Sequence, residues 1–111
     1  MMLYIFEVQI KRGIDPAEYI KAWKRGSQII QRSPGALGIK LYKKRPSYPN
    51  IMLNIAMWES KTARDIAMES LKHADANTRA LLHRHEDFGR VTVIGEFDDT
   101  DEVAAQLEQT Q

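Results

Sequence analysis

The sequence of 111 residues contains no cysteine. Disulfide bonds, thiolate zinc sites, iron–sulfur clusters and cysteine nucleophiles are therefore excluded. It also lacks an apolar run of the roughly 18–20 residues that a membrane-spanning helix needs. The first residues show neither a basic region nor a small-residue cleavage site, so no signal peptide is predicted and a cytoplasmic location is expected.

Net charge is nearly absent, at +1, but the charges are unevenly placed. Residues 1–50 hold ten Lys and Arg against three Asp and Glu, whereas residues 96–111 hold six acids and no base. Lys40–Arg45 is a basic cluster with Tyr42 and Tyr48 interleaved, which would suit single-stranded nucleic acid or a solvated sheet edge. Because the run is short, we favour the edge, and expect the acidic tail to contact the basic edge of a partner subunit.

The 43% of hydrophobic residues follow strand and helix periods that predict one domain over 1–98, with an acidic tail over 99–111. Asp15, Pro16 and Glu18 form a helix start with a capping box, and Ser60 is a second N-cap. A short terminal helix through Leu107 is also expected. Strands are predicted over 3–10, 36–44, 50–58 and 91–97, and helices over 16–32, 61–72 and 76–86.

This β-α-β-β-α-β order predicts an α+β, ferredoxin-like fold, a four-stranded antiparallel sheet with both helices on one face. The other face is also apolar, and is expected to carry Leu3, Ile5, Met52, Ala56, Trp58 and Ile94. Burying that face against a second copy predicts a homodimer. The alternative is a monomer whose tail covers the sheet.

Asn54 and Trp58 lie four residues apart on one face of the third predicted strand. A buried carboxamide that lacks a partner costs about 1–3 kcal/mol, and the indole N–H is a donor that also needs a partner. Either both side chains are satisfied in a core, or they line a cavity that binds an aromatic ligand.

Met57-Trp58-Glu59-Ser60 at a strand end, with Pro34-Gly35 before the second strand, resembles the antibiotic biosynthesis monooxygenase family over residues 2–97. The resemblance implies a dimeric α/β barrel and oxidation of phenol- or quinol-type aromatics by O₂ without cofactor. It implies that Asn54 holds the substrate oxygen and that Trp58 donates to a peroxy intermediate. The family's first-strand Asn corresponds to Phe6, or to Glu7 if the register slips. Substrate contacts are expected from Phe6, Met52, Ala56 and Tyr42.

His83-Arg84-His85 is similar to the axial-histidine segment of the heme-degrading branch of that family. The alternative that this implies is a heme-binding or heme-degrading protein with His83 as the iron ligand and catalytic residue. No metal site is predicted otherwise, because side chains two residues apart on a helix point about 200° apart. As general bases, His83 and His85 have suitable ordinary pKa values.

A third possibility is a non-enzymatic dimer. Such a dimer either binds a small ligand or has no cavity, with Asn54 hydrogen-bonded to the backbone.

Overall fold

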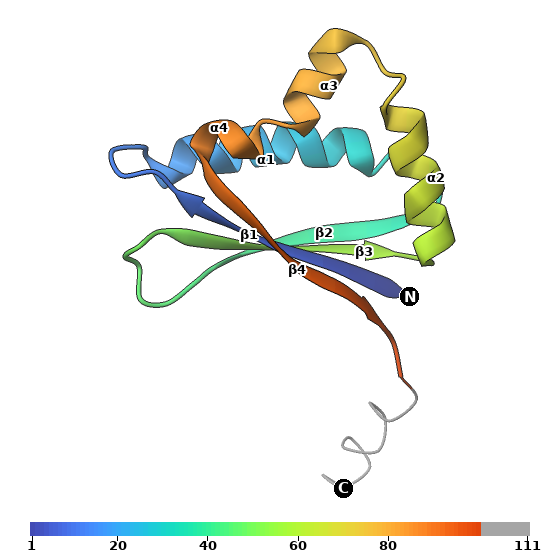
Figure 1. Cartoon of the computed structure of the whole chain (residues 1–111), viewed down its shortest axis with the longest axis horizontal. Helices are drawn as coiled ribbons and strands as arrows, with labels where there is room; N and C mark the ends of the chain where they lie inside the picture. The colour runs from blue at the N-terminus through green and yellow to red at the C-terminus, as the bar shows by residue number, and fades with distance from the viewer. Residues whose placement is uncertain (101–111) are drawn as a thin grey trace, which may run out of the picture.

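The computed structural model describes residues 1–100. The elements are β1 (Met2–Ile10), α1 (Pro16–Ile30), β2 (Ala36–Lys43), β3 (Ile51–Trp58), α2 (Lys61–Leu71), α3 (Ala76–Leu82), α4 (His85–Phe88) and β4 (Gly89–Asp98). The four strands form one antiparallel sheet in the order β2-β3-β1-β4, with the helices over one face (Figure 1). The predicted α+β, ferredoxin-like fold is confirmed, whereas the predicted terminal helix and the tail contact fall outside the described residues.

The two predicted helix starts are confirmed. The Asp15 carboxylate accepts a hydrogen bond from the backbone N–H of Ala17 at 2.9 Å, and the Ser60 hydroxyl accepts one from Ala63 at 3.0 Å. The capping box is wrong in one detail, because Glu18 pairs with Lys21 at 3.5 Å instead. None of the helices within residues 1–100 is long and apolar enough to cross a membrane.

The helix predicted over 76–86 is in fact two helices. The chain leaves helical geometry at His83, with φ −101° and ψ 8°, and α4 begins only at His85. Asp75 caps α3 by accepting from the backbone N–H of Thr78 at 2.9 Å, so the predicted start of this helix at residue 76 is confirmed.

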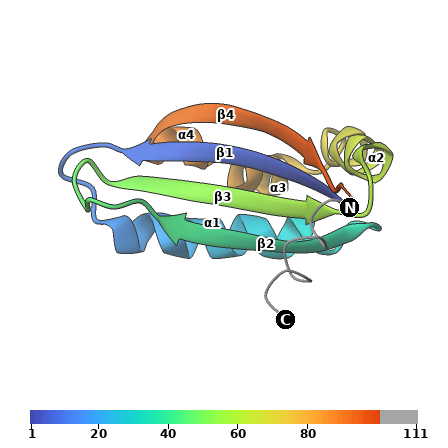
Figure 2. The same ribbon diagram turned by 90° about the horizontal axis from the view of Figure 1, so that it is seen from below.

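The sheet register determines which side chains face the helices. Phe6 pairs with Asn54, and Tyr4 pairs with Ala56, so alternate residues of β1 and β3 share the inner face. The prediction that Met52, Ala56 and Trp58 lie on the outer face is therefore wrong, since all three are buried beneath the helices. The outer face, in front in Figure 2, carries half-buried apolar side chains of the same two strands: Leu3, Ile5, Ile51, Leu53, Ile55 and Met57.

β4 contains a bulge that its alternating sequence concealed. Ile5 pairs with Gly95 but Phe6 pairs with Val93, so Ile94 is an extra residue. Val93 therefore faces the helix side and Phe97 the outer side, although regular alternation along the predicted strand 91–97 would place both on one face.

The inner layer between sheet and helices contains two hydrophobic clusters. The packed half consists of Val8, Ile10, Tyr19, Ala22, Met52 and Phe88. The hollow half consists of Met2, Ala56, Trp58 and Ala67, with partly buried neighbours such as Met68. Asn54, which is 1% exposed, lies on β3 between the two halves.

The turn before β2 holds the start of α2 in place. Gly35 has φ +85°, and a Cβ there would lie 2.6 Å from the Cβ of Ala63. Only glycine tolerates both that backbone angle and that approach. The Gly35 carbonyl also accepts a hydrogen bond from Glu59 at 2.9 Å, which fixes the segment that follows Trp58.

Candidate functional site

A cavity of about 100 Å³ lies in the hollow half, between the sheet, α1 and α2. The small side chain of Ala56 on β3 leaves space at its wall. Gly26 on α1 also lines it, but a Cβ there would meet the Leu81 carbonyl oxygen at 3.3 Å. Its remaining walls are aromatic or aliphatic with a few polar side chains: Tyr4, Phe6, Trp23, Ser27, Ile30, Ile39, Asn54, Trp58, Arg64, Met68 and His85. A small apolar cavity with convergent polar groups is the usual form of a small-ligand site.

A buried polar network forms the cavity wall next to the packed half. The Tyr19 hydroxyl lies 2.8 Å from Nδ1 of His85 and accepts a hydrogen bond from Nδ2 of Asn54 at 3.2 Å. Tyr19 is 0% exposed and Asn54 is 1% exposed, so the bond between them is shielded from water, whereas His85 is half-buried. Asn54 is thus satisfied by a side chain, not by the backbone as the non-enzymatic prediction required.

Burial shifts the ionisation of two members of this network. It raises the pKa of Tyr19 to about 12, partly offset by the hydrogen bond from Asn54. It lowers the pKa of His85, and the nearby His83 lowers it further while Glu86 opposes the shift. At neutral pH the phenol is therefore protonated and the imidazole is neutral.

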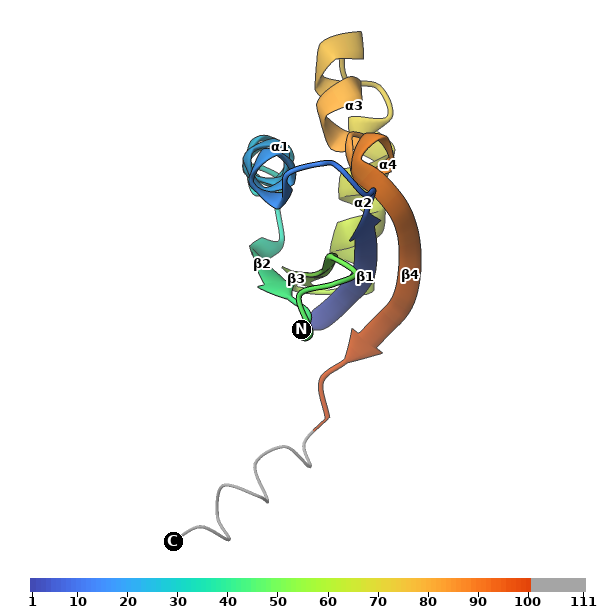
Figure 3. The ribbon, with the colours of Figure 1, turned by 90° about the vertical axis from the view of Figure 1, so that its left-hand side faces the viewer.

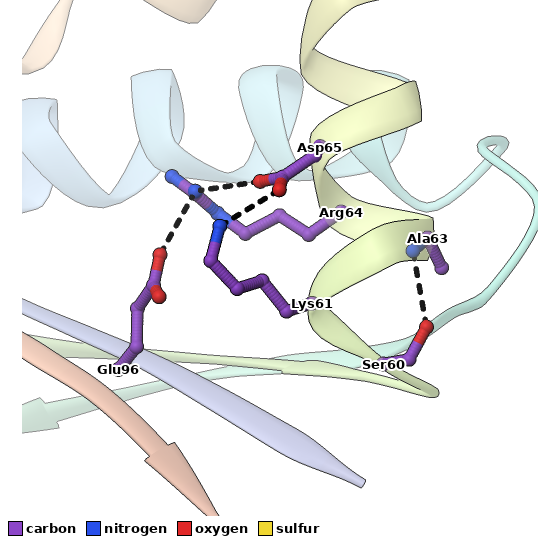
Figure 4. A network of polar contacts seen from close by, with 6 residues as sticks. All are labelled: Ser60, Lys61, Ala63, Arg64, Asp65 and Glu96. Atoms are coloured by element: carbon purple, nitrogen blue, oxygen red, sulfur yellow. Dashed lines mark hydrogen bonds and ion pairs between the residues drawn. The ribbon is translucent and has the colours of Figure 1, made fainter.

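Arg64 is the charged residue of the cavity wall, and Figure 4 shows how it is held. Its Nη1 lies 3.4 Å from Glu96 on β4 and 3.8 Å from Asp65, and its guanidinium stacks 4.0 Å from the centre of the Tyr4 ring. Lys61 pairs with Asp65 at 2.7 Å. The four charges of this cluster cancel, so the rim is polar without carrying net charge.

Four of the residues expected from the sequence lie in the cavity wall: Phe6, Asn54, Ala56 and Trp58. The open choice between Phe6 and Glu7 is settled by the register, which places Phe6 on the inner face. Met52 lies in the packed half, and Tyr42 pairs with Leu53 on the outer face, 48% exposed. Tyr42 lies outside the cavity because it faces away from the helices. Met52 shares the inner face with Asn54, but it packs among the side chains of the packed half.

His83 is exposed and borders a separate hollow of about 170 Å³, whereas His85 borders both that hollow and the cavity. The sequence named His83 as the candidate, whereas His85 is the histidine that lines the cavity, because the helix break between them was not foreseen. Tyr19, Trp23 and Arg64 were also missed as site residues. Tyr19 lies one turn before Trp23 on α1, so the helix period offered a signal for it.

Comparison with known proteins gave matches to solved structures alone. No protein-family model matches the sequence, and no curated protein matches it. SnoaB, a cofactor-independent oxygenase from Streptomyces nogalater, has a TM-score of 0.71 at 19% identity, over 90% of this chain and 93% of that one. A structure described as an antibiotic biosynthesis monooxygenase has a TM-score of 0.64 at 20% identity, over 90% and 99%.

The fold is of the antibiotic biosynthesis monooxygenase type. An uncharacterized NIPSNAP domain protein from Burkholderia xenovorans shares it too, with a TM-score of 0.70 at 16% identity over 91% of this chain and 96% of that one. Because proteins with different descriptions share this fold, the activity has to be argued from the cavity.

Proposed function

We propose that the protein is an oxygenase that oxidises a small phenol or hydroquinone with O₂, without a bound flavin, heme or metal. One observation carries the proposal: Asn54 and Trp58 both line a single aromatic-walled cavity. The likeness of the fold to a cofactor-independent oxygenase supports it. Such a reaction needs an electron-rich substrate in a dry site with donors placed where negative charge develops on oxygen.

In this reaction a hydroquinone and O₂ give a hydroxyquinone and water. One oxygen atom enters the ring and the other leaves as water, and the substrate supplies all four electrons. Asn54 donates an amide N–H to the ionised substrate oxygen. The indole N–H of Trp58 stabilises the charge that develops on the oxygen derived from O₂.

The size of the cavity restricts the substrate. An engineered cavity of about 150 Å³ binds benzene, so a cavity of about 100 Å³ has room for at most a single ring and none for a tricyclic substrate. A tetrapyrrole does not fit this space, and His83 lies outside it. This cavity is therefore too small for heme, and no step through iron is derived.

Oxygen consumption with purified, EDTA-treated protein tests the proposal. We expect turnover with monocyclic hydroquinones to exceed that with naphthols and anthrones. The Asn54→Ala and Trp58→Phe variants should each lose about 10²-fold or more in rate, while Asn77→Ala, on α3, should not. No enzyme-dependent consumption with any of these substrates would refute the oxygenase.

The same proposal includes a homodimer that packs through the outer sheet face. Half-buried Leu53 and Ile55 lie at the centre of that face, and Phe97 is 46% exposed at its edge. Sedimentation velocity should show a dimer that Leu53→Lys dissociates. If the acidic tail contacts the partner's basic edge, deleting residues 99–111 should weaken the dimer at low salt; an unchanged dissociation constant would count against that contact.

A further inference from the structure

The Tyr19 hydroxyl joins two residues of the cavity wall, Asn54 and His85, and has one hydrogen to donate. The acceptor that lies at a normal distance is Nδ1 of His85, at 2.8 Å. The other oxygen in reach, Oδ1 of Asn54, lies at 3.5 Å, which is long for a bond from a hydroxyl. Nδ2 of Asn54 lies closer, at 3.2 Å, and as a donor it needs the hydroxyl oxygen to accept. The bonding therefore runs from Asn54 to Tyr19 to His85.

This direction determines which hydrogens remain available. A neutral imidazole that accepts at Nδ1 carries its hydrogen on Nε2. Asn54 uses one amide hydrogen on Tyr19 and keeps the second. Tyr19 cannot reverse the order by ionising near neutral pH, because its pKa is raised to about 12.

Donors outnumber acceptors among the polar side chains of the wall. The indoles of Trp23 and Trp58 and the guanidinium of Arg64 have no acceptor atom, whereas the hydroxyls of Ser27 and Tyr4 can donate or accept. The Trp23 N–H is buried without a partner among residues 1–100. A cavity with more donors than acceptors favours an oxygen that only accepts, because most positions for a ligand hydrogen would face a donor.

We propose that Tyr19 is a positioning residue: its hydroxyl fixes Asn54 and His85 as N–H donors, and the cavity thereby selects a single-ring aromatic whose oxygen is an ionised acceptor. This deepens the proposed function by naming the form of the substrate that binds, the phenolate. It does not require turnover. The titratable or charged groups around His85 are Tyr19 from α1, Tyr4 from β1, Arg64 from α2, and His83 and Glu86 next to it in the chain.

The tautomer of His85 can be read directly by ¹⁵N NMR of the histidine-labelled protein at neutral pH. We expect Nδ1 to be unprotonated and Nε2 to carry the hydrogen. A protonated Nδ1 would reverse the bonding direction and overturn the proposal. This measurement uses the unaltered chain, so it does not depend on whether a variant folds.

Binding of 4-nitrophenol tests the selection, because its absorbance reports its ionisation. We expect the pKa of the bound probe to lie roughly one unit below its value in water, a tenfold preference for the anion. Tyr19→Phe should remove most of this shift, whereas Tyr48→Phe, in the exposed β2–β3 loop, should keep it. An unshifted or raised pKa in the wild type, or a full shift in folded Tyr19→Phe, would overturn the proposal.

These outcomes are separate from those of the oxygenase assay. A selective phenolate site with no O₂ consumption would keep this inference and refute the proposed function. O₂ consumption with no preference for the anion would keep the proposed function and refute this inference.

Discussion

The packed half and the hollow half of the inner layer are built on the same two central strands, yet only the packed half closes. In the packed half, Met52 on β3 meets Val8 on β1 and the rings of Tyr19 and Phe88. In the hollow half, the position four residues along β3 is Ala56, and a cavity remains beside it. The difference shows that a small residue at one buried position of β3 is enough to leave the cavity open. The polar network lies at the boundary, where one side is solid and the other accessible.

The largest expected effect comes from opening the packed half. Met52→Ala should lower the free energy of unfolding by about 2–5 kcal/mol, because it leaves a cavity that the neighbours fill only in part. Urea unfolding measures this loss. The matched variant Met68→Ala, at the wall of the existing cavity, should lose clearly less. Equal losses would erase the distinction between the halves.

Breaking the boundary network should cost less. Tyr19→Phe removes one hydroxyl and leaves buried Asn54 and His85 without their partner, which predicts a loss of about 1–3 kcal/mol in urea unfolding. The ring itself remains to pack against Phe88, at 5.6 Å between ring centres. A variant as stable as the wild type would mean that water replaces the hydroxyl.

The network should also make stability depend on pH. Because the pKa of His85 is lowered in the folded protein, the unfolded chain binds a proton below about pH 6.5 that the folded protein does not. The free energy of unfolding should therefore fall as the pH drops below this value, and the effect should vanish above it. Urea midpoints at about pH 7.5 and about pH 5.5 measure this fall.

Two histidine variants isolate that contribution. His85→Gln should flatten the pH dependence, whereas His73→Gln, with a side chain that is 79% exposed, should leave it unchanged. If both variants kept the wild-type slope, carboxylates and not His85 would account for the acid sensitivity.

The smallest effect on stability is expected from filling the hollow half. Ala56→Leu should change the free energy of unfolding by no more than about 1 kcal/mol, because it adds atoms where space exists. It should nevertheless abolish binding of 4-nitrophenol. Ala22→Leu is the matched control, since Ala22 is also 8% exposed but lies in the packed half. There the added atoms should cost about 1–3 kcal/mol.

The sequence predicted the strands, their order and the two helix starts, because period and capping residues act over a few neighbours. Asn54 and Trp58 could be paired for the same reason, since spacing along one strand is a local property. The contacts of Tyr19 with His85 join residues 66 positions apart, and depend on how α1 and α4 meet above the sheet (Figure 3). The sequence also could not show which face of β3 the helices cover, because both faces of this strand are apolar.

The extra residue in β4, Ile94, determines whether Glu96 or Phe97 faces the helices beside the cavity. With regular alternation after Val93, Phe97 would turn toward the helices and Glu96 would turn away from them. The bulge exchanges the two, so that Glu96 pairs across from Tyr4 and meets Arg64. The charge beside this part of the cavity wall is therefore set by the number of residues along one strand. One residue more or fewer between Val93 and Glu96 would separate Glu96 from Arg64 without replacing either side chain.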